Sequence, residues 1–281
     1  PGPGELELAV EATGLNFRDV LNALGLLAGY SRELGMDADA RMPYGGECVG
    51  RVVAVGPGVD PGLVGERLLA ALAVGSLASH VVCRAALCVP LPPALDPALG
   101  ASVSTAFLTA IYGLQTLAQL LPGDTVLIHA AAGGVGQAAL QVARRCGARV
   151  FATASAAKQA GLRQQGVEAV FDSRSLDFAE QVLAVTGGRG VDVVLNSLKG
   201  DWVEASFAAL AAGGFLLNAT GFDVDLGGNQ SEHTIYLMRI FDAFIPFVAS
   251  GIAIWAIATF SITEEKAHEI RLQLEARRGS V

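Results

Sequence analysis

The pattern of apolar and polar positions divides the chain into two parts with different expected structures. Residues 1–98 are rich in glycine and carry short strand patterns. Glu5–Ala12 alternates acidic and apolar residues, as a half-buried strand does, and further strands are expected at Glu66–Ala73 and His80–Cys83. Met42–Val59 is interrupted by glycines and predicts a β-hairpin or a pair of strands. The first part is therefore expected to be β-rich.

From Leu99 onward, apolar runs alternate with segments of helical spacing. Ala101–Gln119 predicts one apolar helix or two short ones. Strands are expected at Thr125–His129, Ala148–Ala154, Glu168–Asp172, Val191–Leu195 and Gly214–Ala219, and helices at Gln137–Arg145, Lys158–Gln165, Asp177–Thr186 and Trp202–Leu210. Such alternation is typical of a doubly wound parallel sheet. The sequence thus predicts an α/β protein with a Rossmann-type domain and a β-rich domain.

The expected domain boundaries follow from these patterns and from the tail. Pro90–Asp96 is proline-rich and predicts a linker, and Ile252–Phe260 predicts a late strand. We expect residues 1–98 and 250–281 to form the β-rich domain, to which the family resemblance described below assigns substrate binding. Residues 99–249 would form the Rossmann domain.

A strand, a loop of small residues and a helix follow one another at Thr125–Arg145. Gly133 would let the backbone approach a pyrophosphate, Gly136 would let the helix pack close to the strand, and the helix N-terminus favours an anion. Ala131 holds the position of the first glycine, so the pattern is A-x-G-x-x-G. The candidate cofactor-binding residues are Ala131, Gly133, Gly134, Val135 and Gly136. The alternative is an ordinary tight turn between strand and helix.

The end of the next strand narrows the choice of cofactor. A dinucleotide site for NAD usually has Asp or Glu there, which binds the ribose 2′-OH. Here the segment after Thr153 contains no acid but has Ser155 and Lys158. A hydroxyl and a cation suit a 2′-phosphate, so NADPH is favoured over NADH. The alternative for Lys158 is an ordinary solvated lysine at a helix start.

Composition excludes some classes of function. The 281 residues are 52% hydrophobic and 16% charged, which suits a large core with buried parallel strands. The net charge of −8 argues against nucleic acid or an anionic membrane as a partner. The most apolar stretch, Ile245–Phe260, is interrupted by Pro246, Ser250 and Gly251, so no membrane span is expected.

The cysteines and the start of the chain suggest a location and a context. Cys48, Cys83, Cys88 and Cys146 lack metal-ligand spacing and are expected to be reduced, mostly buried thiols of a cytoplasmic protein. The chain opens at Pro1 without Met, which suggests a piece of a longer protein.

Four motifs together resemble one family. Gly14–Leu21, His129–Gly136, Val150–Ser155 and Gly187–Leu198 are similar to the enoyl reductase domain of a modular type I polyketide synthase, which is related to the fatty acid synthase enoyl reductase. The resemblance implies a medium-chain dehydrogenase/reductase fold with a GroES-like substrate domain. It also implies NADPH-dependent reduction of a trans-2-enoyl thioester, with hydride added at Cβ and a proton at Cα. The substrate would be carried on the phosphopantetheine of an acyl carrier protein, beside neighbouring megasynthase domains.

A metal is not expected. Zinc dehydrogenases of the wider superfamily have Gly-His-Glu where this chain has Gly45-Gly46-Glu47, and the clustered cysteines of a structural zinc lobe are missing. Without a tetrahedral set of ligands, no zinc is predicted.

The resemblance also assigns candidate residues to the reaction. The amide of Asn16 would polarise the thioester carbonyl or hold the nicotinamide carboxamide, and Thr109 matches a position that approaches the nicotinamide. Asn196, Ser197 and Leu198 end a strand at the crevice where such sheets bind ligands. The alternatives are a turn asparagine at Asn16, a plain helix threonine at Thr109, and an Asx turn at Asn196.

The proton donor has two candidates, because the resemblance places a lysine and an aspartate at Lys158 and Asp177. Lys158 cannot easily serve as both phosphate ligand and acid, and phosphate binding has the independent sequence argument. Asp177 is more simply a carboxylate at a helix start.

The sequence departs from the family at Leu27, where many members have a tyrosine tied to the stereochemistry at Cα, and at Ala219-Thr220, where the family has Gly-Lys. Two rival functions remain open. One is a free-standing quinone oxidoreductase-like reductase, and the other is a degenerate, non-catalytic scaffold domain of a megasynthase.

Overall fold

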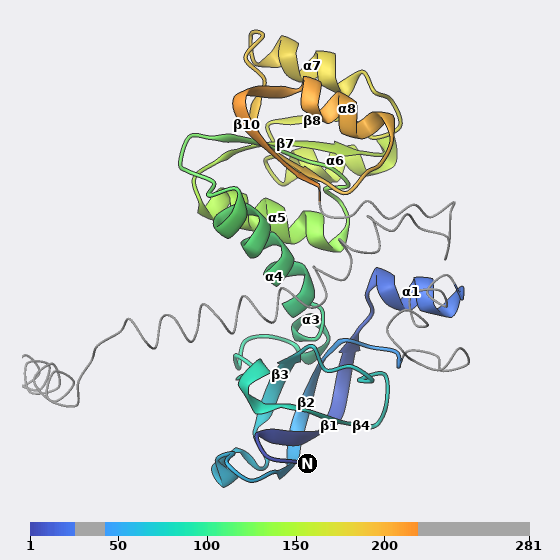
Figure 1. Ribbon diagram of the computed structural model, residues 1–281, viewed down its shortest axis with the longest axis vertical. Coiled ribbons are helices and arrows are strands. Elements are labelled where there is room, and N and C mark those ends of the chain that lie inside the picture. The colour runs from blue at the N-terminus through green and yellow to red at the C-terminus, as the bar shows by residue number, and fades with distance from the viewer. Residues whose placement is uncertain (26–42, 219–281) are drawn as a thin grey trace, which may run out of the picture. The chain divides into compact units, whose positions relative to one another are not determined.

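The computed structural model describes residues 1–25 and 43–218, which build two five-stranded sheets (Figure 1). One sheet is antiparallel and lies in the N-terminal part, and the other is parallel and is flanked by helices. This confirms the predicted fold class. The expectations for residues 250–281, Leu27 and Ala219-Thr220 fall outside the described residues.

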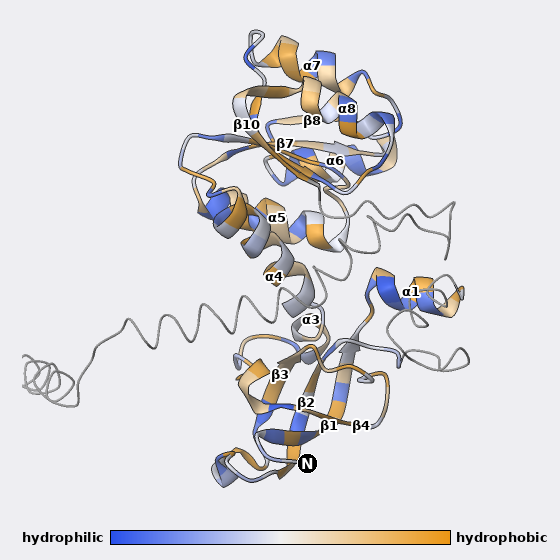
Figure 2. Ribbon diagram, in the orientation of Figure 1, coloured by the Kyte–Doolittle hydropathy of each residue, from blue (hydrophilic) through white to orange (hydrophobic). Residues whose placement is uncertain are grey.

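The antiparallel sheet has the strand order β4-β1-β2-β3-β5. Its strands are β1 (Glu5–Gly14), β2 (Glu47–Val55), β3 (Arg67–Ala71), β4 (His80–Arg84) and β5 (Cys88–Pro90), with helix α1 (Phe17–Ala23) and the 3₁₀ turns η1 (Pro61–Leu63) and η2 (Ala85–Leu87) between them. Alternate residues of β1 and β4 are buried, so that Leu6, Leu8 and Val81 enter one apolar core. Apolar and polar bands along the strands are visible in Figure 2.

One prediction for this sheet is wrong. Of the expected range Met42–Val59, the described residues 43–59 contain a single strand, β2, and not a hairpin or a pair. Its glycine does not mark a turn. A Cβ on Gly50 would lie 2.6 Å from the carbonyl oxygen of Ala9 on β1, so glycine allows the close approach of two paired strands.

The connection between the sheets differs from the expected linker, whereas its helical part matches the expected alternative of two short helices. Pro90 ends the short strand β5, which the sequence did not predict, and Asp96 caps helix α3 (Pro97–Gly100). The expected helix of residues 101–119 is divided into α4 (Ser104–Ile111) and a π-helical turn, η3 (Tyr112–Leu117).

The parallel sheet has the order β10-β9-β6-β7-β8. Its elements are β6 (Thr125–Ile128), α5 (Gly134–Arg145), β7 (Arg149–Ala154), α6 (Ala156–Gln164), β8 (Ala169–Asp172), α7 (Phe178–Val185), β9 (Val191–Asn196), α8 (Asp201–Ala208) and β10 (Leu210–Asn218). Every residue of β6 is buried, as expected where helices cover both faces of a parallel sheet.

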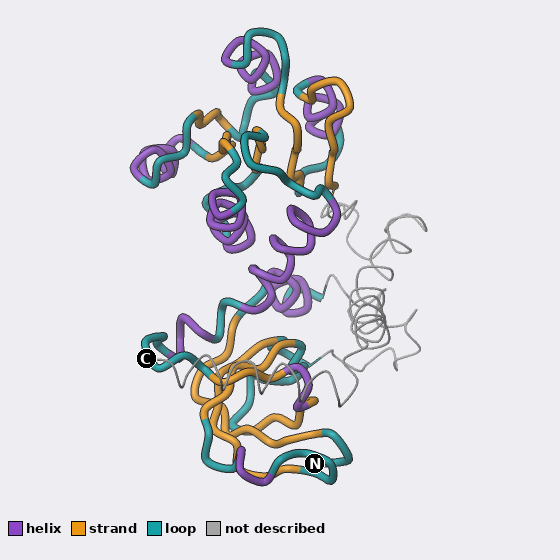
Figure 3. The backbone as a smooth tube through the Cα atoms, turned by 90° about the vertical axis from the view of Figure 1, so that its left-hand side faces the viewer, coloured by secondary structure: helices purple, strands orange, loops and turns teal. Residues whose placement is uncertain are grey.

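The helices lie on both faces of this sheet (Figure 3). Ile128 of β6 belongs to the core formed with α4, α5 and α6, and its neighbour Leu127 belongs to the core formed with α7 and α8. Because successive side chains of a strand point to opposite faces, each buried strand joins the two cores.

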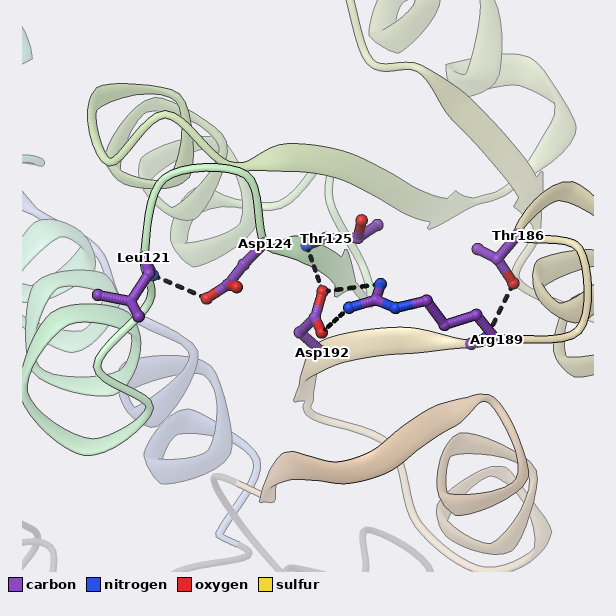
Figure 4. Close-up of polar contacts among 7 residues, drawn as sticks. Leu121, Asp124, Thr125, Thr186, Arg189 and Asp192 are labelled. Carbon is purple, nitrogen blue, oxygen red and sulfur yellow. Dashed lines mark hydrogen bonds and ion pairs between the residues drawn. The ribbon is translucent and has the colours of Figure 1, made fainter.

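Polar contacts secure the edge of the parallel sheet at which β6 and β9 begin (Figure 4). Asp192 at the start of β9 accepts a hydrogen bond of 2.8 Å from the backbone N–H of Thr125, and Arg189 donates to the same carboxylate. The carboxyl ends of the strands, at the opposite edge, carry the candidate site.

No helix among the described residues has the length and apolar character needed to cross a membrane.

Candidate active site

The loop between β6 and α5 forms an open helix N-terminus. Gly133 is the N-cap of α5 in extended conformation, and no side chain caps this end. A Cβ on Gly136 would lie 2.5 Å from the carbonyl oxygen of Ala130, so this position requires glycine for the helix to pack against the loop. The amides of the first helical turn therefore face outward with the positive end of the helix dipole, which suits a pyrophosphate.

The other candidate residues of this loop differ in burial. Ala131 is buried, and its N–H donates to the carbonyl oxygen of Thr153 on β7 at 3.2 Å, so it shapes the loop from inside. Val135 is partly exposed, and a side chain added at Gly134 would meet no atom. The loop is thus anchored on one side and open on the other.

The end of β7 leads directly into α6. Ser155 is the N-cap of α6 in extended conformation, and its hydroxyl makes no capping hydrogen bond. The backbone N–H of Lys158 donates to the carbonyl oxygen of Ser155 at 2.8 Å, and the Lys158 side chain is exposed. No acidic residue lies between Ala154 and Lys158. A hydroxyl and a cation are consequently available where a ribose phosphate would be bound.

The sequence interpretation missed Arg174, which lies at the same edge of the sheet. Ala154 of β7 pairs with Asp172 of β8, and Arg174 follows two residues later with an exposed side chain. The Asp172 carboxylate accepts a hydrogen bond of 3.0 Å from the Arg174 backbone N–H. A basic residue directly after the third strand is the signal that would have identified it.

A buried polar cluster around His129 lies next to the loop between β6 and α5. His129 directly follows β6 and is 3% exposed, and its Nδ1 lies 2.9 Å from the hydroxyl of Thr153 and its Nε2 lies 3.0 Å from the hydroxyl of Ser206. The ring of Phe178 meets the imidazole edge-on. Burial lowers the pKa of His129 to about 4, so the ring is neutral at physiological pH.

Asn196 ends β9 in an Asx turn. Its side-chain amide donates to the carbonyl oxygen of Leu198 at 2.9 Å and accepts from the Leu198 N–H at 3.0 Å. The Asn196 side chain is fully buried, whereas Ser197 is exposed. The Asx turn considered as an alternative is therefore present, and it presents Ser197 at the carboxyl edge of the sheet.

Asn16 is held by two carboxylates. It is the N-cap of α1, and its backbone N–H donates to Asp19 at 2.9 Å. Its side-chain amide donates to Oε1 of Glu47 at 3.0 Å. The second oxygen of the Asp19 carboxylate accepts the N–H of Gly45 at 2.8 Å. The amide of Asn16 thus has a defined orientation.

Glu47 joins this group to helix α4. It is 2% exposed, and its Oε2 accepts hydrogen bonds from the hydroxyl of Ser104 and, at 2.7 Å, from the N–H of Thr105. The hydroxyl of Thr109 donates to the carbonyl oxygen of Thr105 at 2.8 Å. Asn16 and Thr109, which are far apart in the sequence, therefore belong to one connected set of hydrogen bonds.

Both oxygens of Glu47 accept hydrogen bonds from N–H and O–H donors, so this buried carboxylate has at least three partners within the protein. Within residues 1–25 and 43–218, no group of three or more His, Cys, Asp and Glu could hold a metal ion. The sequence interpretation had not assigned Glu47 or Asp19 a role, although a carboxylate at the first position of a buried strand is unusual enough to draw attention.

Asp177 and Lys158 are not brought into contact. Asp177 is the exposed N-cap of α7, and its carboxylate does not cap the helix. No hydrogen bond or ion pair between described residues joins it to Lys158. The expected helix-start position of Asp177 is confirmed, and its catalytic role stays a prediction.

Two family models match the chain. One is described as an alcohol dehydrogenase GroES-like domain and matches residues 2–93, and the other is described as a zinc-binding dehydrogenase and matches residues 134–237.

Among curated proteins, the chain is 46% identical over 228 residues to the phthioceranic/hydroxyphthioceranic acid synthase of Mycobacterium bovis (strain BCG / Pasteur 1173P2). The match covers 81% of this chain and 10% of that protein, so the chain spans about a tenth of the length of this relative.

Among solved structures, the chain is similar to the CurK enoyl reductase, with a TM-score of 0.76 and 39% identity over 86% of this chain and 80% of that one. It is also similar to mycobacterial Rv1454c complexed with NADPH, with a TM-score of 0.68 and 32% identity over 94% of this chain and 83% of that one.

Proposed function

Since the chain belongs to the enoyl reductase domains of polyketide synthases, within the medium-chain dehydrogenase/reductase superfamily, we propose that it reduces a trans-2-enoyl thioester with NADPH. The product is the saturated acyl thioester of a growing polyketide chain. The substrate is carried on the phosphopantetheine of an acyl carrier protein, and the neighbouring domains of a cytoplasmic megasynthase supply and receive it.

The observation that carries this proposal is the uncapped N-terminus of α5 beside the acid-free end of β7. Gly136 lets α5 pack against the loop, and the uncapped N-terminus at Gly133 offers its amides to a pyrophosphate. Ser155, Lys158 and Arg174 offer a hydroxyl and two cations for a 2′-phosphate, a preference that the NADPH complex of the related Rv1454c supports.

NADPH, when bound, supplies the hydride that is added to Cβ. The residues of the chain bind the cofactor, orient the thioester and protonate Cα. The loop of Ala131, Gly133, Gly134, Val135 and Gly136 holds the pyrophosphate, and the Asx turn of Asn196 presents Ser197 and Leu198 toward the nicotinamide side of the dinucleotide. Thr109, whose hydroxyl donates to Thr105 within α4, is assigned to the nicotinamide side from the family resemblance.

Asn16 orients the substrate side. Its amide nitrogen already donates one hydrogen to Glu47, which leaves the second N–H for the thioester carbonyl or the nicotinamide carboxamide. A hydrogen bond to the thioester oxygen stabilises the negative charge that develops there when Cβ accepts a hydride. No metal is needed for this polarisation, and the proposed enzyme is independent of zinc.

Protonation at Cα completes the reaction, and Lys158 and Asp177 are the two candidate donors. Lys158 is assigned mainly to the 2′-phosphate, because it lies at the end of β7 where a ribose would be bound. Asp177 is exposed at the start of α7. A general acid is most effective with a pKa near the working pH.

The test is single-turnover oxidation of NADPH with crotonyl and 2-methylcrotonyl thioesters in the wild type and in Gly133→Asp. Gly133 is an N-cap in extended conformation, where Asp is a preferred residue, and the added Cβ would lie 3.2 Å from the carbonyl oxygen of Ala130, a tight contact that a small shift of the loop relieves. The Asp carboxylate would repel a pyrophosphate, and we expect NADPH affinity to fall about 100-fold, or about 2.7 kcal/mol. Gly161→Asp on the exposed face of α6, where an added side chain meets no atom, is the matched control.

Three results would contradict the proposal. Equal NADPH affinity in both variants would exclude the α5 loop as the cofactor site. Tight NADPH binding without turnover of any enoyl thioester would favour a scaffold domain, and turnover of quinones alone would favour a quinone reductase. Lys158→Met separates the two roles of its lysine: a phosphate ligand raises KM for NADPH but not for NADH, whereas a proton donor lowers kcat with both.

A further inference from the structure

Two cysteines meet at the edges of the antiparallel sheet. Cys83 lies on β4 and Cys88 begins β5, and these strands are the first and last in the order β4-β1-β2-β3-β5. The turn η2 joins them and brings their Sγ atoms to 3.5 Å. Cys83 is 7% exposed, and Cys88 is half-buried. The sulfurs therefore touch, and one of them has partial access to solvent.

The surroundings make the two thiols unequal. The Cys88 thiol also lies 3.4 Å from the carbonyl oxygen of Arg84. The hydrogen bond between the thiols lowers the pKa of Cys83 and raises that of Cys88, and burial raises the Cys88 value further. Cys83 is thus the better source of a thiolate, with the Cys88 thiol in direct contact with it.

The two other cysteines lack this arrangement. Cys48 is fully buried in the same core, and burial raises its pKa to about 12. Cys146 is half-buried at the end of α5, where its sulfur lies 3.5 Å from the side-chain amide of Gln115. Reactivity toward an oxidant should therefore be concentrated at Cys83 and Cys88.

We propose that Cys83 and Cys88 form a modification site, an oxidisable dithiol that a hydroperoxide converts into an intramolecular disulfide. The Cys83 thiolate attacks one peroxide oxygen and breaks the O–O bond, which gives a sulfenic acid and, after protonation, one water from hydrogen peroxide. The Cys88 sulfur then attacks the sulfenic sulfur, the S–S bond forms, and the S–O bond breaks with loss of a second water. Two electrons pass from the sulfurs to the peroxide, and a small dithiol reverses the change.

The disulfide would join strands that are otherwise held together only through η2 and the shared core. No ladder pairs β4 with β5 among the described strands. Leu6, Leu8 and Leu68 lie in the same core as both cysteines. The bond would close the row of five strands covalently around this core, and it uses none of the residues assigned to cofactor or substrate.

The experiment exposes the reduced full chain to increasing hydrogen peroxide, blocks the remaining thiols with iodoacetamide, and maps peptides after cleavage at arginine. Arginines separate all four cysteines, and Arg84 lies between Cys83 and Cys88. The two peptides stay joined only if a disulfide links them. We expect the count of free thiols to fall from four to two before Cys146 is oxidised, and dithiothreitol to restore four.

Single variants complete the test. Cys88→Ser should prevent formation of the disulfide-linked peptides. Cys146→Ser should leave these linked peptides unchanged. Mapping of the wild type does not depend on any variant folding. Oxidation of Cys146 while Cys83 and Cys88 stay reduced, or a disulfide that involves Cys48, would overturn the proposal.

Discussion

The antiparallel and parallel sheets bury polar side chains of different kinds. Among the described residues, the two buried carboxylates, Asp19 and Glu47, both belong to the antiparallel side. The buried polar groups in and beside the strands of the parallel sheet are neutral: Thr125, His129, Thr153, Asn196 and Ser206. Fully buried charge is therefore found on the antiparallel side, whereas the polar groups buried on the parallel side are uncharged.

The difference follows from what each group must hold. Glu47 accepts hydrogen bonds from Asn16, Ser104 and Thr105, and so joins the start of α1 to the start of α4. A buried charge is tolerated only with several donors, and it binds them strongly. His129 connects two strand ends to α8 with a single hydrogen bond on each ring nitrogen, and burial lowers its pKa so that the ring is neutral. Charge fixes the candidate substrate side, and a neutral imidazole fixes the cofactor side.

The largest expected effect tests the charged side. Glu47→Gln places an NH₂ group against N–H and O–H donors in either orientation of the amide. Because at least one buried donor loses its acceptor, we expect the free energy of unfolding to fall by about 2–4 kcal/mol. Urea denaturation at neutral pH measures this change.

The control for this variant is Glu66→Gln, an exposed glutamate that precedes β3. Its effect should stay within about 0.5 kcal/mol. Equal urea midpoints for Glu47→Gln and Glu66→Gln would show that the buried carboxylate does not stabilise the fold. The contrast between a charged and a neutral side would then fail.

The next effect tests the neutral side and depends on pH. The folded-state pKa of His129 lies below its ordinary value of 6.5, at about 4, so the unfolded chain binds the proton more readily. The contribution of His129 to the free energy of unfolding is fully present above pH 6.5 and is lost as pH falls toward 4. At pH 5 the loss from this residue should be about 2 kcal/mol relative to pH 8.

His129→Gln removes the titration, so the stability difference between wild type and variant should shrink by about 2 kcal/mol from pH 8 to pH 5. Urea denaturation at both pH values measures it. His80→Gln, at an exposed histidine on β4, is the control. A constant difference for His129→Gln would mean that the buried ring is not held neutral.

The smallest effect concerns a surface charge on the parallel sheet. Arg149 at the start of β7 donates from Nε to Glu168 at 3.0 Å, and this pair lowers the pKa of Glu168. Both side chains are about half exposed, so Glu168→Gln should cost about 0.5 kcal/mol at low salt and less at 1 M salt. A loss of unfolding free energy as large as that of Glu47→Gln, measured by the same urea denaturation, would show that burial does not determine how much a carboxylate stabilises this protein.

Sequence patterns predicted the parallel sheet closely, because its buried strands are short apolar runs between turn residues. β7 and β8 begin one residue after the expected positions and end where expected, at Ala154 and Asp172. The antiparallel sheet was harder. The glycines of Met42–Val59 suggested a hairpin or a pair of strands, although Gly50 allows two paired strands to approach, and β5 is too short to show an alternating pattern.

The candidate site was only partly predictable. The loop glycines and the end of β7 lie where local sequence indicates them. The connection of Asn16 to Thr109 through Glu47, and that of His129 to Ser206, joins residues that are distant along the chain. Such contacts arise from the packing of elements, which periodicity does not encode.

The pairing of β1 also bears on the order in which the sheets are completed as the chain is synthesised. Glu5 pairs with Arg84 on β4, and Gly14 pairs with Glu47 on β2, so β1 precedes both of its partners. On the ribosome, β1 would have both edges unpaired until β2 and β4 emerge. Contacts of such long range form slowly and leave unpaired strand edges exposed in the meantime. The nascent segment from Glu5 to Arg84 is therefore the place where a chaperone would have the longest time to bind.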